Sequence, residues 1–587
     1  MSKVSIFDLP HILELIGHNL PWRDILSSAR VCYSWNQVFG PLAWRNLELG
    51  AFDYTKLLAE STSLNLLADR APTVHSLTIR YAEPMWAFLD YIDGHPGLFS
   101  NNLTRLTMTS KDERSYDHPA RMLLRWLNIA KDHLEHLDVS FHRLAMASAF
   151  STPDTVQTSF LSLHSLRSMA LQCDSLVQGR DLAMILRYCP ESLEFLRIDC
   201  PIRETYDPVG FWRTVQAPAT INSEAALLEF FWREATPTNI QTLQLPCSFR
   251  KNELTTLIPF LRLRCPKLTT WDGVPLMRPA VGINLAQVLS TSCLQLEDIK
   301  FHDVSVEMLA LYPQIIRSCH GLKSLTITGK VHDAKDVVQA VTQSQARTIT
   351  RIRWTGSGGF HGRMDMEEIL RSCSSLERLE TTFSQTYNFF SGQGAAGAMW
   401  SKDGPLEAPM PTTVPEPSSP YFWACGATLT HLDVTFCLQK SATTTETNVR
   451  DQVELTYRKL GQLCALVQLR LGCRCRCYGR QLVNCKHFEI DAVNGDVNSV
   501  GGYVVEDRDV ILDMSLNTGL AHLAGLRMLR SLSIGRIQGH RIGYAELEWM
   551  QENWPALQYF GGVRNMRIVD WVEANWPSVR VLYMDSL

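Results

Sequence analysis

Residues 322–328 read LKSLTIT, residues 349–355 read ITRIRWT and residues 376–382 read LERLETT. Each segment has apolar residues at its first and fourth positions, and the first two have another at the sixth. Alternation of this kind places the fourth and sixth side chains on one face of a β-strand. The segments begin 27 residues apart. The sequence therefore predicts one short strand that recurs at a fixed interval.

Related segments occur sixteen times along the chain, from VHSLTIR to VRVLYMD. We call the fourth residue of each segment the marker residue. Most intervals between markers lie near 27, which is within the 20–29 residues of leucine-rich repeats. The markers are residues 77, 106, 137, 169, 196, 243, 271, 299, 325, 352, 379, 432, 469, 532, 560 and 582.

This pattern predicts an α/β fold, a leucine-rich-repeat solenoid with a curved parallel sheet inside and helices outside. Helix-like fragments precede the strands at 181–189, 308–319 and 365–373, as that fold requires. Several of the fragments end in cysteine, which resembles the cysteine-containing class of these repeats. A residue type that recurs at one structural position indicates packing of buried free thiols rather than catalysis. The cysteines are Cys189, Cys265, Cys293, Cys319 and Cys373.

The long intervals between markers predict insertions near residues 200–238, 385–425 and 473–525. Residues 391–420 are rich in Gly, Ala, Pro and Ser, which is typical of an extended loop. Residues 438–462 are expected to form a polar loop that leads into an amphipathic helix. The repeat domain as a whole is assigned to residues 73–587.

The N-terminal residues 7–47 show a different pattern, with three short helical segments. In the first, Ile12, Leu13, Ile16 and Leu20 fall on one helical face, and Pro21 is expected to end the helix. The second begins at Asp24 as N-cap and turns Ile25, Leu26, Ala29 and Val31 inward. The third contains Trp35, Val38 and Phe39 and ends before Gly40. So small a module leaves apolar surface for a partner to cover.

The order and spacing of residues 8–47 resemble the F-box family. The resemblance includes Leu9-Pro10, Leu20-Pro21, Asp24-Ile25-Leu26, Val31-Cys32 and Leu42-x-Trp44. His11 departs from it, since the family usually has an acidic residue there. The resemblance implies binding to the Skp adaptor through Leu9, Pro10, Ile12, Leu13, Ile16, Leu20, Pro21, Leu26, Val31, Cys32 and Trp35.

The implied organisation is an F-box at residues 1–48, a linker helix region at 49–72 and the repeats thereafter. Through the Skp adaptor the chain would join cullin and RING subunits as the non-catalytic substrate-recognition subunit of an SCF-type ubiquitin ligase. The repeats would bind an unknown protein substrate. The alternative is a non-catalytic repeat scaffold that acts outside a ubiquitin ligase. Loosely matching repeats with long inserts resemble the large receptor families of fungi.

The substrate surface is expected on the concave face, where residues next to each marker point away from the core. It has a mixed charge, and nothing in it identifies the substrate. Its candidate residues are Arg197, Lys300, His302, Arg353, Thr355, Glu380, Asp433 and Arg470, together with Asp138, Gln244, Thr326 and Ser533.

Signals for catalysis and cofactors are weak. A cysteine cluster, Cys473, Cys475, Cys477, Cys485 and His487, has zinc-ligand types, but its spacing is not a paired C-x2-C site, so unligated cysteines are the main interpretation. The glycine-rich run at 356–362 lacks a full phosphate-binding motif and is expected to be the strand-to-helix turn of one repeat. No catalytic constellation is found, and no cofactor is expected.

Composition limits the remaining possibilities. The 587 residues are 45% hydrophobic and 20% charged, with a formal net charge of −4, which argues against a disordered chain. This balance supplies no long-range attraction for nucleic acid or an anionic membrane. The N-terminus has no signal-peptide pattern. We therefore expect a cytoplasmic or nuclear protein without nucleic-acid or membrane partners.

Overall fold

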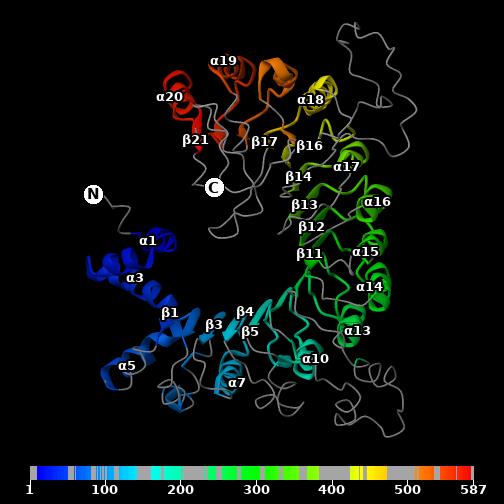
Figure 1. The fold of residues 1–587 in the computed structure, drawn as a ribbon. Helices are drawn as coiled ribbons and strands as arrows, with labels where there is room; N and C mark the ends of the chain where they lie inside the picture. The colour runs from blue at the N-terminus through cyan, green and yellow to red at the C-terminus, as the bar shows by residue number, and fades with distance from the viewer. Residues whose placement is uncertain are drawn as a thin grey trace, which may run out of the picture. The chain divides into compact units, whose positions relative to one another are not determined.

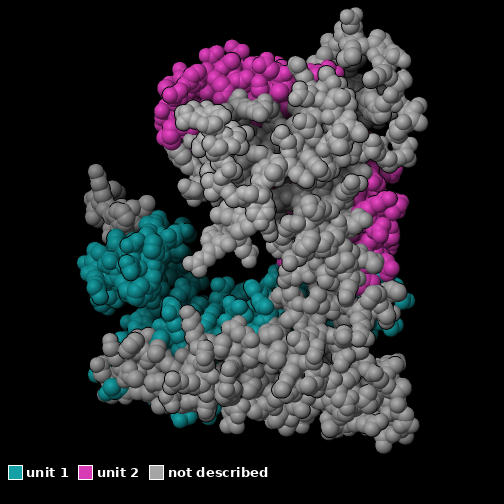
Figure 2. Space-filling model, in the orientation of Figure 1, with its two compact units in different colours: residues 1–296 teal, residues 297–587 magenta. Residues whose placement is uncertain are grey.

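A computed structural model describes most of the chain between residues 9 and 582. Two compact units divide it, residues 1–296 and residues 297–587 (Figure 2). The main described ranges are 9–50, 61–80, 102–110, 118–141, 160–173, 177–199, 236–245, 254–273, 279–304, 311–329, 335–355, 366–381, 423–434, 446–471, 514–534, 542–563 and 565–582, with a few shorter pieces.

The first unit begins with three helices and continues as parallel strands joined through helices (Figure 1). Its helices are α1 (Pro10–Gly17), α2 (Trp22–Ala29), α3 (Tyr33–Arg45), α5 (Ser61–Arg70), α7 (His118–Ala130), α10 (Gly179–Tyr188), α13 (Leu254–Arg264) and α14 (Pro279–Ser292). Its parallel strands are β1 (Asn46–Leu49), β2 (Ser76–Arg80), β3 (Arg105–Ser110), β4 (His136–Phe141), β5 (Ser168–Cys173), β7 (Phe195–Asp199), β9 (Thr242–Gln244) and β10 (Thr270–Asp272), each paired with the next.

The second unit repeats the same strand–helix alternation. Its helices are α15 (Tyr312–Ser318), α16 (Lys335–Ser344), α17 (Met366–Ser372), α18 (Glu446–Gly461), α19 (Tyr544–Asn553) and α20 (Met566–Asn575). Its parallel strands are β11 (Asp298–Val304), β12 (Ser324–Gly329), β13 (Arg351–Thr355), β14 (Arg378–Thr381), β15 (His431–Val434), β17 (Gln468–Leu471), β19 (Ser531–Ile534), β20 (Tyr559–Gly561) and β21 (Arg580–Leu582), again each paired with the next.

Small pairings lie outside these ladders. In the first unit β6 (Val177–Gln178) runs parallel to β8 (Ile202–Arg203), and in the second β16 (Cys437–Gln439) runs antiparallel to β18 (Asp509–Ile511). Figure 1 shows α15, α16 and α17 side by side along one side of strands β11 to β14. No helix in the described ranges is both long and apolar enough to cross a membrane.

All sixteen predicted segments contain a strand, and the predicted parallel α/β repeat architecture is confirmed. In the second unit Ile299, Leu325, Ile352 and Leu379 occupy equivalent places in successive strands and are at most 1% exposed. Burial of a side chain this size contributes about 1.5–3 kcal/mol. The recurring marker therefore builds a continuous apolar core, one layer per repeat.

Four local predictions differ from the structure. The sheet begins with β1, ahead of residue 73, and the marker of the last segment is Val581, which pairs with Phe560, rather than Leu582. Helix α2 begins at Trp22 after Pro21, so Asp24 lies in its first turn and is not the N-cap. Helix α3 continues through Gly40 and Pro41 to Arg45. Packing of Leu42 and Ala43 on the helical core offsets the hydrogen bond that the proline removes.

The five repeated cysteines each follow directly after a helix and are buried, namely Cys189, Cys265, Cys293, Cys319 and Cys373. Burial disfavours the thiolate and raises the pKa of Cys189, Cys293 and Cys373 to about 12. At neutral pH these groups are protonated, free thiols. The predicted packing role at the corner between helix and strand agrees with this placement.

The thiols should therefore differ sharply in reactivity. At pH 8 we expect iodoacetamide to modify the exposed Cys32 and Cys464 at least about a hundredfold faster than Cys189, Cys293 and Cys373, since the thiolate is the nucleophile. Peptide-resolved mass spectrometry of the labelled protein measures the rates. Labelling in concentrated urea is the control and should make the rates similar. Equal rates in the folded protein would contradict the burial described.

Candidate protein-interaction surfaces

The three N-terminal helices enclose a small core. Leu13, Ile25, Ala29 and Phe39 are buried in it, and the half-buried side chains around them are Leu20, Trp35, Val38, Leu42 and Ala43. Gly17 lets α1 approach α3, because a side chain there would meet Leu42 and Phe39. The indole nitrogen of Trp22 donates to the carbonyl oxygen of Ala43 at 3.2 Å and ties α2 to the end of α3.

Apolar side chains remain on the outside of this helical module. Ile16 is 38% exposed and Val31 63% exposed, and Pro10, Pro21 and Cys32 are also exposed. Only four apolar residues are buried in the described part of the module, so this exposed surface is large for the size of the core. Apolar surface that a small module cannot cover by itself is a mark of an interaction site.

The predicted adaptor-binding residues fall into two groups, those that pack in or against the core and those that are exposed. The exposed group is Pro10, Ile16, Pro21, Val31 and Cys32. Leu13 belongs to the core, with Leu20 and Trp35 packed against it, while Leu9, Ile12 and Leu26 are half-buried. The helical face predicted for Ile12, Leu13, Ile16 and Leu20 is divided, since Leu13 is buried and Ile16 exposed, and the inward placement of Val31 was wrong. Burial follows Leu13 and Gly17, one turn apart, because the glycine permits close contact with α3.

Three exposed apolar residues in the module were missing from the prediction. Leu15 is 66% exposed, Trp22 55% and Tyr33 80%. Leu15 lies beside the predicted Ile16, and Trp22 and Tyr33 directly follow the predicted Pro21 and Cys32. Their position in the motif was a usable signal, but large apolar side chains are ordinarily assigned to a core.

The polar faces of the strands form a second candidate surface in each unit. The predicted residues that follow the markers lie in cross-strand register, as strand alternation requires. In the first unit the row is Thr78, Thr107, Asp138, Ala170, Arg197, Gln244 and Asp272. In the second unit it is Lys300, Thr326, Arg353, Glu380, Asp433, Arg470 and Ser533.

Charges in the first-unit row are few. Arg197 forms an ion pair with Asp199 of its own strand, with 3.1 Å between Nη2 and Oδ2. Burial raises the pKa of Asp138, and the positive charge of Arg197 partly offsets this shift. Asp138 and Arg197 lie on β4 and β7, with Ala170 of β5 in register between them. The row thus combines the basic Arg197 on β7 with the acidic Asp138 on β4 and Asp272 on β10.

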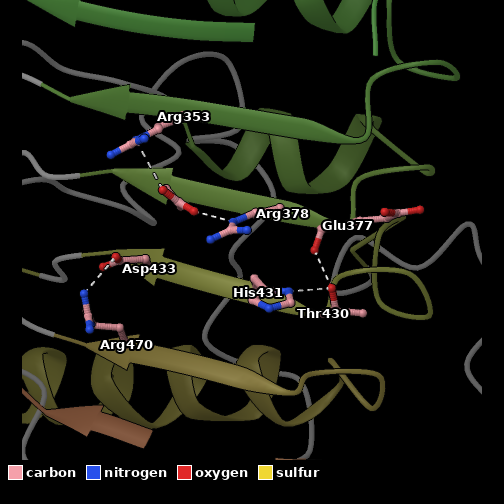
Figure 3. Close-up of polar contacts among 8 residues, drawn as sticks. Arg353, Glu377, Arg378, Thr430, His431, Asp433 and Arg470 are labelled. Carbon is pink, nitrogen blue, oxygen red and sulfur yellow. Dashed lines mark hydrogen bonds and ion pairs between the residues drawn. The ribbon is translucent and has the colours of Figure 1, made fainter. Parts of the chain in front are cut away.

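Ion pairs cross the strands of the second unit (Figure 3). Glu380 on β14 accepts from Arg353 on β13, with 3.4 Å between Nε and Oε2, and also from Arg378 on its own strand. Asp433 on β15 pairs with Arg470 on β17, with 3.6 Å between Oδ2 and Nη1. Glu380 and Asp433 are largely buried beneath the arginines. These pairs hold the guanidinium groups in defined places on the strand face.

A polar hollow of about 360 Å³ lies over strands β11 to β17 in the second unit. We call it the arginine hollow. Its lining combines the row after the markers with the row before them. The lining residues are Asp298, Lys300, Ser324, Thr326, Arg351, Arg353, Arg378, Glu380, His431, Leu432, Asp433 and Gln468.

The prediction included only one of these two rows. Residues immediately before each marker, such as Arg351, Arg378 and His431, share the polar face with those immediately after it. The period of two was sufficient to assign both rows. Of the remaining predicted residues, His302 and Thr355 lie near the carboxyl ends of β11 and β13, and His302 Nδ1 is 3.0 Å from Thr328 Oγ1.

His431 has a defined hydrogen-bond setting in the hollow. The Thr430 hydroxyl lies 3.0 Å from the carbonyl oxygen of Glu377 and 2.8 Å from His431 Nδ1 (Figure 3). Since a carbonyl only accepts, the hydroxyl proton goes to Glu377, and His431 Nδ1 carries the proton that it donates to Thr430. Burial of the ring lowers the pKa of His431, and Arg378 and Arg351 lower it further against the opposing effect of Glu380. The imidazole is therefore neutral at pH 7.

The structure does not describe the residues of the weak zinc-binding and phosphate-binding candidates. Cys473, Cys475, Cys477, Cys485 and His487, and the run at 356–362, lie outside the described residues. Among the described residues no cluster of three or more His, Cys, Asp or Glu side chains is arranged to hold a metal ion.

Comparisons with known proteins give distant structural likenesses. The chain is similar to the leucine-rich repeat-containing protein LegL7 from Legionella pneumophila, at 14% identity and a TM-score of 0.29, over 52% of this chain and 87% of that one. It is also similar to a Bacteroides fragilis protein, at 13% identity and a TM-score of 0.28, over 52% and 73% of the two chains. No protein-family model and no curated protein matches the sequence. The repeat architecture accordingly rests on the strand register described above.

Proposed function

We propose that this protein is a non-catalytic substrate-recognition subunit of an SCF-type ubiquitin ligase. The N-terminal helices would bind the Skp adaptor and, through it, cullin and RING subunits. The repeats would bind the protein substrate. The observation that carries this proposal is the exposed apolar surface on the helical module, formed by residues of the F-box pattern, including Pro10, Ile16 and Val31.

The amount of this surface supports a docking role. Ile16, Trp22, Val31 and Tyr33 are exposed in a module whose described part has a core of four buried residues. Burial of apolar area stabilises association at about 25 cal/mol per Å², so a complementary partner gains from covering these side chains. Buried aromatic residues are frequent anchors of protein interfaces. The module therefore exposes the kinds of apolar and aromatic side chains that one partner contributes to a protein interface.

A subunit of this kind supplies proximity. Simultaneous binding of adaptor and substrate raises the effective concentration of a substrate lysine near the ubiquitin-charged enzyme. The described strand faces contain ion pairs and hydrogen bonds suited to recognition, and the proposal assigns them no chemical step. The alternative is a non-catalytic repeat scaffold that acts outside a ubiquitin ligase.

Co-expression with the Skp adaptor tests the proposal. Size-exclusion chromatography of the native chain should give a one-to-one complex. The variant Pro10→Ala/Ile16→Ala/Val31→Ala should lose at least about a hundredfold in affinity, since each change removes exposed contact area and leaves the buried core in place. Circular dichroism should show that it remains folded.

Met528→Ala/Tyr544→Ala/Met566→Ala is the matched control. It also truncates three exposed apolar side chains, but in the second unit. This control should bind the adaptor as the native chain does. A folded native protein that ignores the adaptor would refute the ligase role and favour the scaffold. Adaptor complexes that never contain cullin or RING subunits would favour adaptor binding outside a ligase.

A further inference from the structure

We propose that the arginine hollow binds an acidic side chain, Asp or Glu, of the partner protein between Arg351 and Arg378 and beside His431. The inference rests on the proposed function in one respect, namely that the repeats bind a protein. It adds the chemical class of the segment that they recognise. The hollow lies wholly within the second unit.

The charge of the hollow favours an anion. Its lining has four cationic side chains, Lys300, Arg351, Arg353 and Arg378, and three carboxylates. With His431 neutral, one positive charge is in excess, although the whole chain has a formal charge of −4. An acidic group is therefore attracted to this place against the net charge of the protein.

The excess is concentrated at Arg351 and Arg378. These residues are partners in register on β13 and β14, so two guanidinium groups lie on neighbouring strands. Glu380 is engaged by Arg378 and also by Arg353. Arg351 makes no ion pair with any other described residue. Like charges on paired strands repel each other, and a carboxylate between them would remove that repulsion.

The rest of the hollow is suited to the peptide that bears the acidic side chain. Asp298 is in the same row as Arg351, and its Oδ1 is buried without a hydrogen-bond partner among the described residues. Two strand spacings, about 10 Å, separate these positions. Because Asp298 is half-buried and lines the hollow, a donor such as a backbone N–H can approach the open side of its carboxylate while a side chain two or three residues away reaches Arg351. The volume of about 360 Å³ accommodates such a short segment.

The same site predicts a pH dependence. His431 faces Arg378 and Glu380 of β14 and Arg351 of β13, and Asp433 on its own strand is paired with Arg470 of β17. A bound carboxylate offsets the arginine charges and raises the pKa of His431, so the complex takes up protons more readily than the free protein. Affinity should then increase as the pH falls through the His431 pKa of the complex and level off below that of the free protein.

Fluorescence anisotropy of the full-length chain tests the proposal. The probe is a fluorescein-labelled peptide, Gly-Ser-Asp-Glu-Asp-Ser-Gly, compared with Gly-Ser-Asn-Gln-Asn-Ser-Gly. We expect the acidic peptide to bind at least about tenfold more tightly than the amide peptide and to weaken with added salt. Arg351→Met should lower its affinity about tenfold, and it breaks no described ion pair that would be needed for folding.

Arg567→Met is the control, because it removes an equally positive, exposed side chain from α20 in the same unit. It should leave binding unchanged. Between pH 7.5 and 5.5 the native affinity should rise several-fold, and His431→Asn should abolish this rise. Equal binding of the two peptides, no binding at 1 mM peptide (about the weakest affinity worth testing), or an equal loss in Arg567→Met would overturn the proposal.

Adaptor binding, measured on the same preparations, separates this inference from the ligase role. If the protein binds the acidic peptide but does not bind the adaptor, the proposed anion site is supported and the ligase role is refuted. If the protein binds the adaptor but shows no preference for the acidic peptide, the ligase role is supported and the proposed anion site is refuted.

Discussion

Replacing Gln345 with leucine is expected to lower the free energy of unfolding by about 3–5 kcal/mol. The side chain is 1% exposed and lies directly after helix α16. Its Nε2 donates to the carbonyl oxygens of Ile316 at 2.8 Å and Cys319 at 2.7 Å, and its Oε1 accepts from the backbone N–H of Leu322 at 3.1 Å. Leucine keeps the approximate volume and leaves three backbone groups without partners.

The size of this effect follows from burial. Each buried polar group left unsatisfied costs about 1–3 kcal/mol, because neither water nor another donor replaces the lost bond. Gln345 occupies the corner position at which other repeats have a cysteine, and Cys293 Sγ likewise lies 3.6 Å from the carbonyl oxygen of Cys265 in the preceding repeat. Gln345→Cys should therefore destabilise less than Gln345→Leu, since it retains one donor.

Urea unfolding followed by tryptophan fluorescence measures the loss. Hydrogen exchange of the peptides that cover residues 312–329 should locate it, because a repeat array need not unfold as one cooperative unit. Gln314→Leu makes the same chemical change at an exposed site on α15 and should alter stability by less than about 0.5 kcal/mol. Equal effects of the two substitutions would show that the buried amide bonds contribute little.

Substitution of Gly562 by alanine is expected to be comparably damaging, at about 3–5 kcal/mol. Gly562 follows β20 and has a φ of +87°, in the left-handed region that favours glycine. A Cβ atom there would overlap the carbonyl oxygen of Ile534, the last residue of the neighbouring strand β19. The backbone can give way only if the ends of these two strands separate.

The variant Gly321→Ala separates the cost of a left-handed backbone from the cost of the steric overlap. Gly321 has nearly the same φ, +89°, and no heavy atom lies within 4 Å of the position that its Cβ would take. This variant should lose only about 1–2 kcal/mol, the ordinary cost of a left-handed alanine. The difference between the two variants, measured by urea unfolding, reports the close contact of Gly562 with β19. Similar losses in both would mean that the strand ends adapt without cost.

Much of the fold follows from local patterns in the sequence. Sixteen segments were predicted as strands and all sixteen contain one, because an alternating apolar pattern has a single way to face a core. The amphipathic helix expected within residues 438–462 is present as α18, and the corner cysteines are buried as predicted. The segment that became β1 escaped prediction although residues 44–50 have the same apolar spacing, because Trp44 was assigned to the N-terminal helical module.

The candidate surfaces were harder to predict from local sequence patterns. Which apolar residues of the N-terminal module remain outside depends on how α1 meets α3 at Gly17, and an apolar pattern cannot distinguish Leu13 from Ile16. Pro41 was expected to end a helix that continues, since packing of its neighbours outweighs the local preference.

The sequence alone determined the repeat, all but the last of its marker residues and the face on which the polar residues lie, because each of these depends on spacing within one short segment. The arginine hollow was decided by tertiary structure. Arg351, Arg378 and His431 are separated by 27 and 53 residues along the chain and stand side by side only because the buried markers Ile352, Leu379 and Leu432 bring their strands into register. Charge pairing across strands depends on that register.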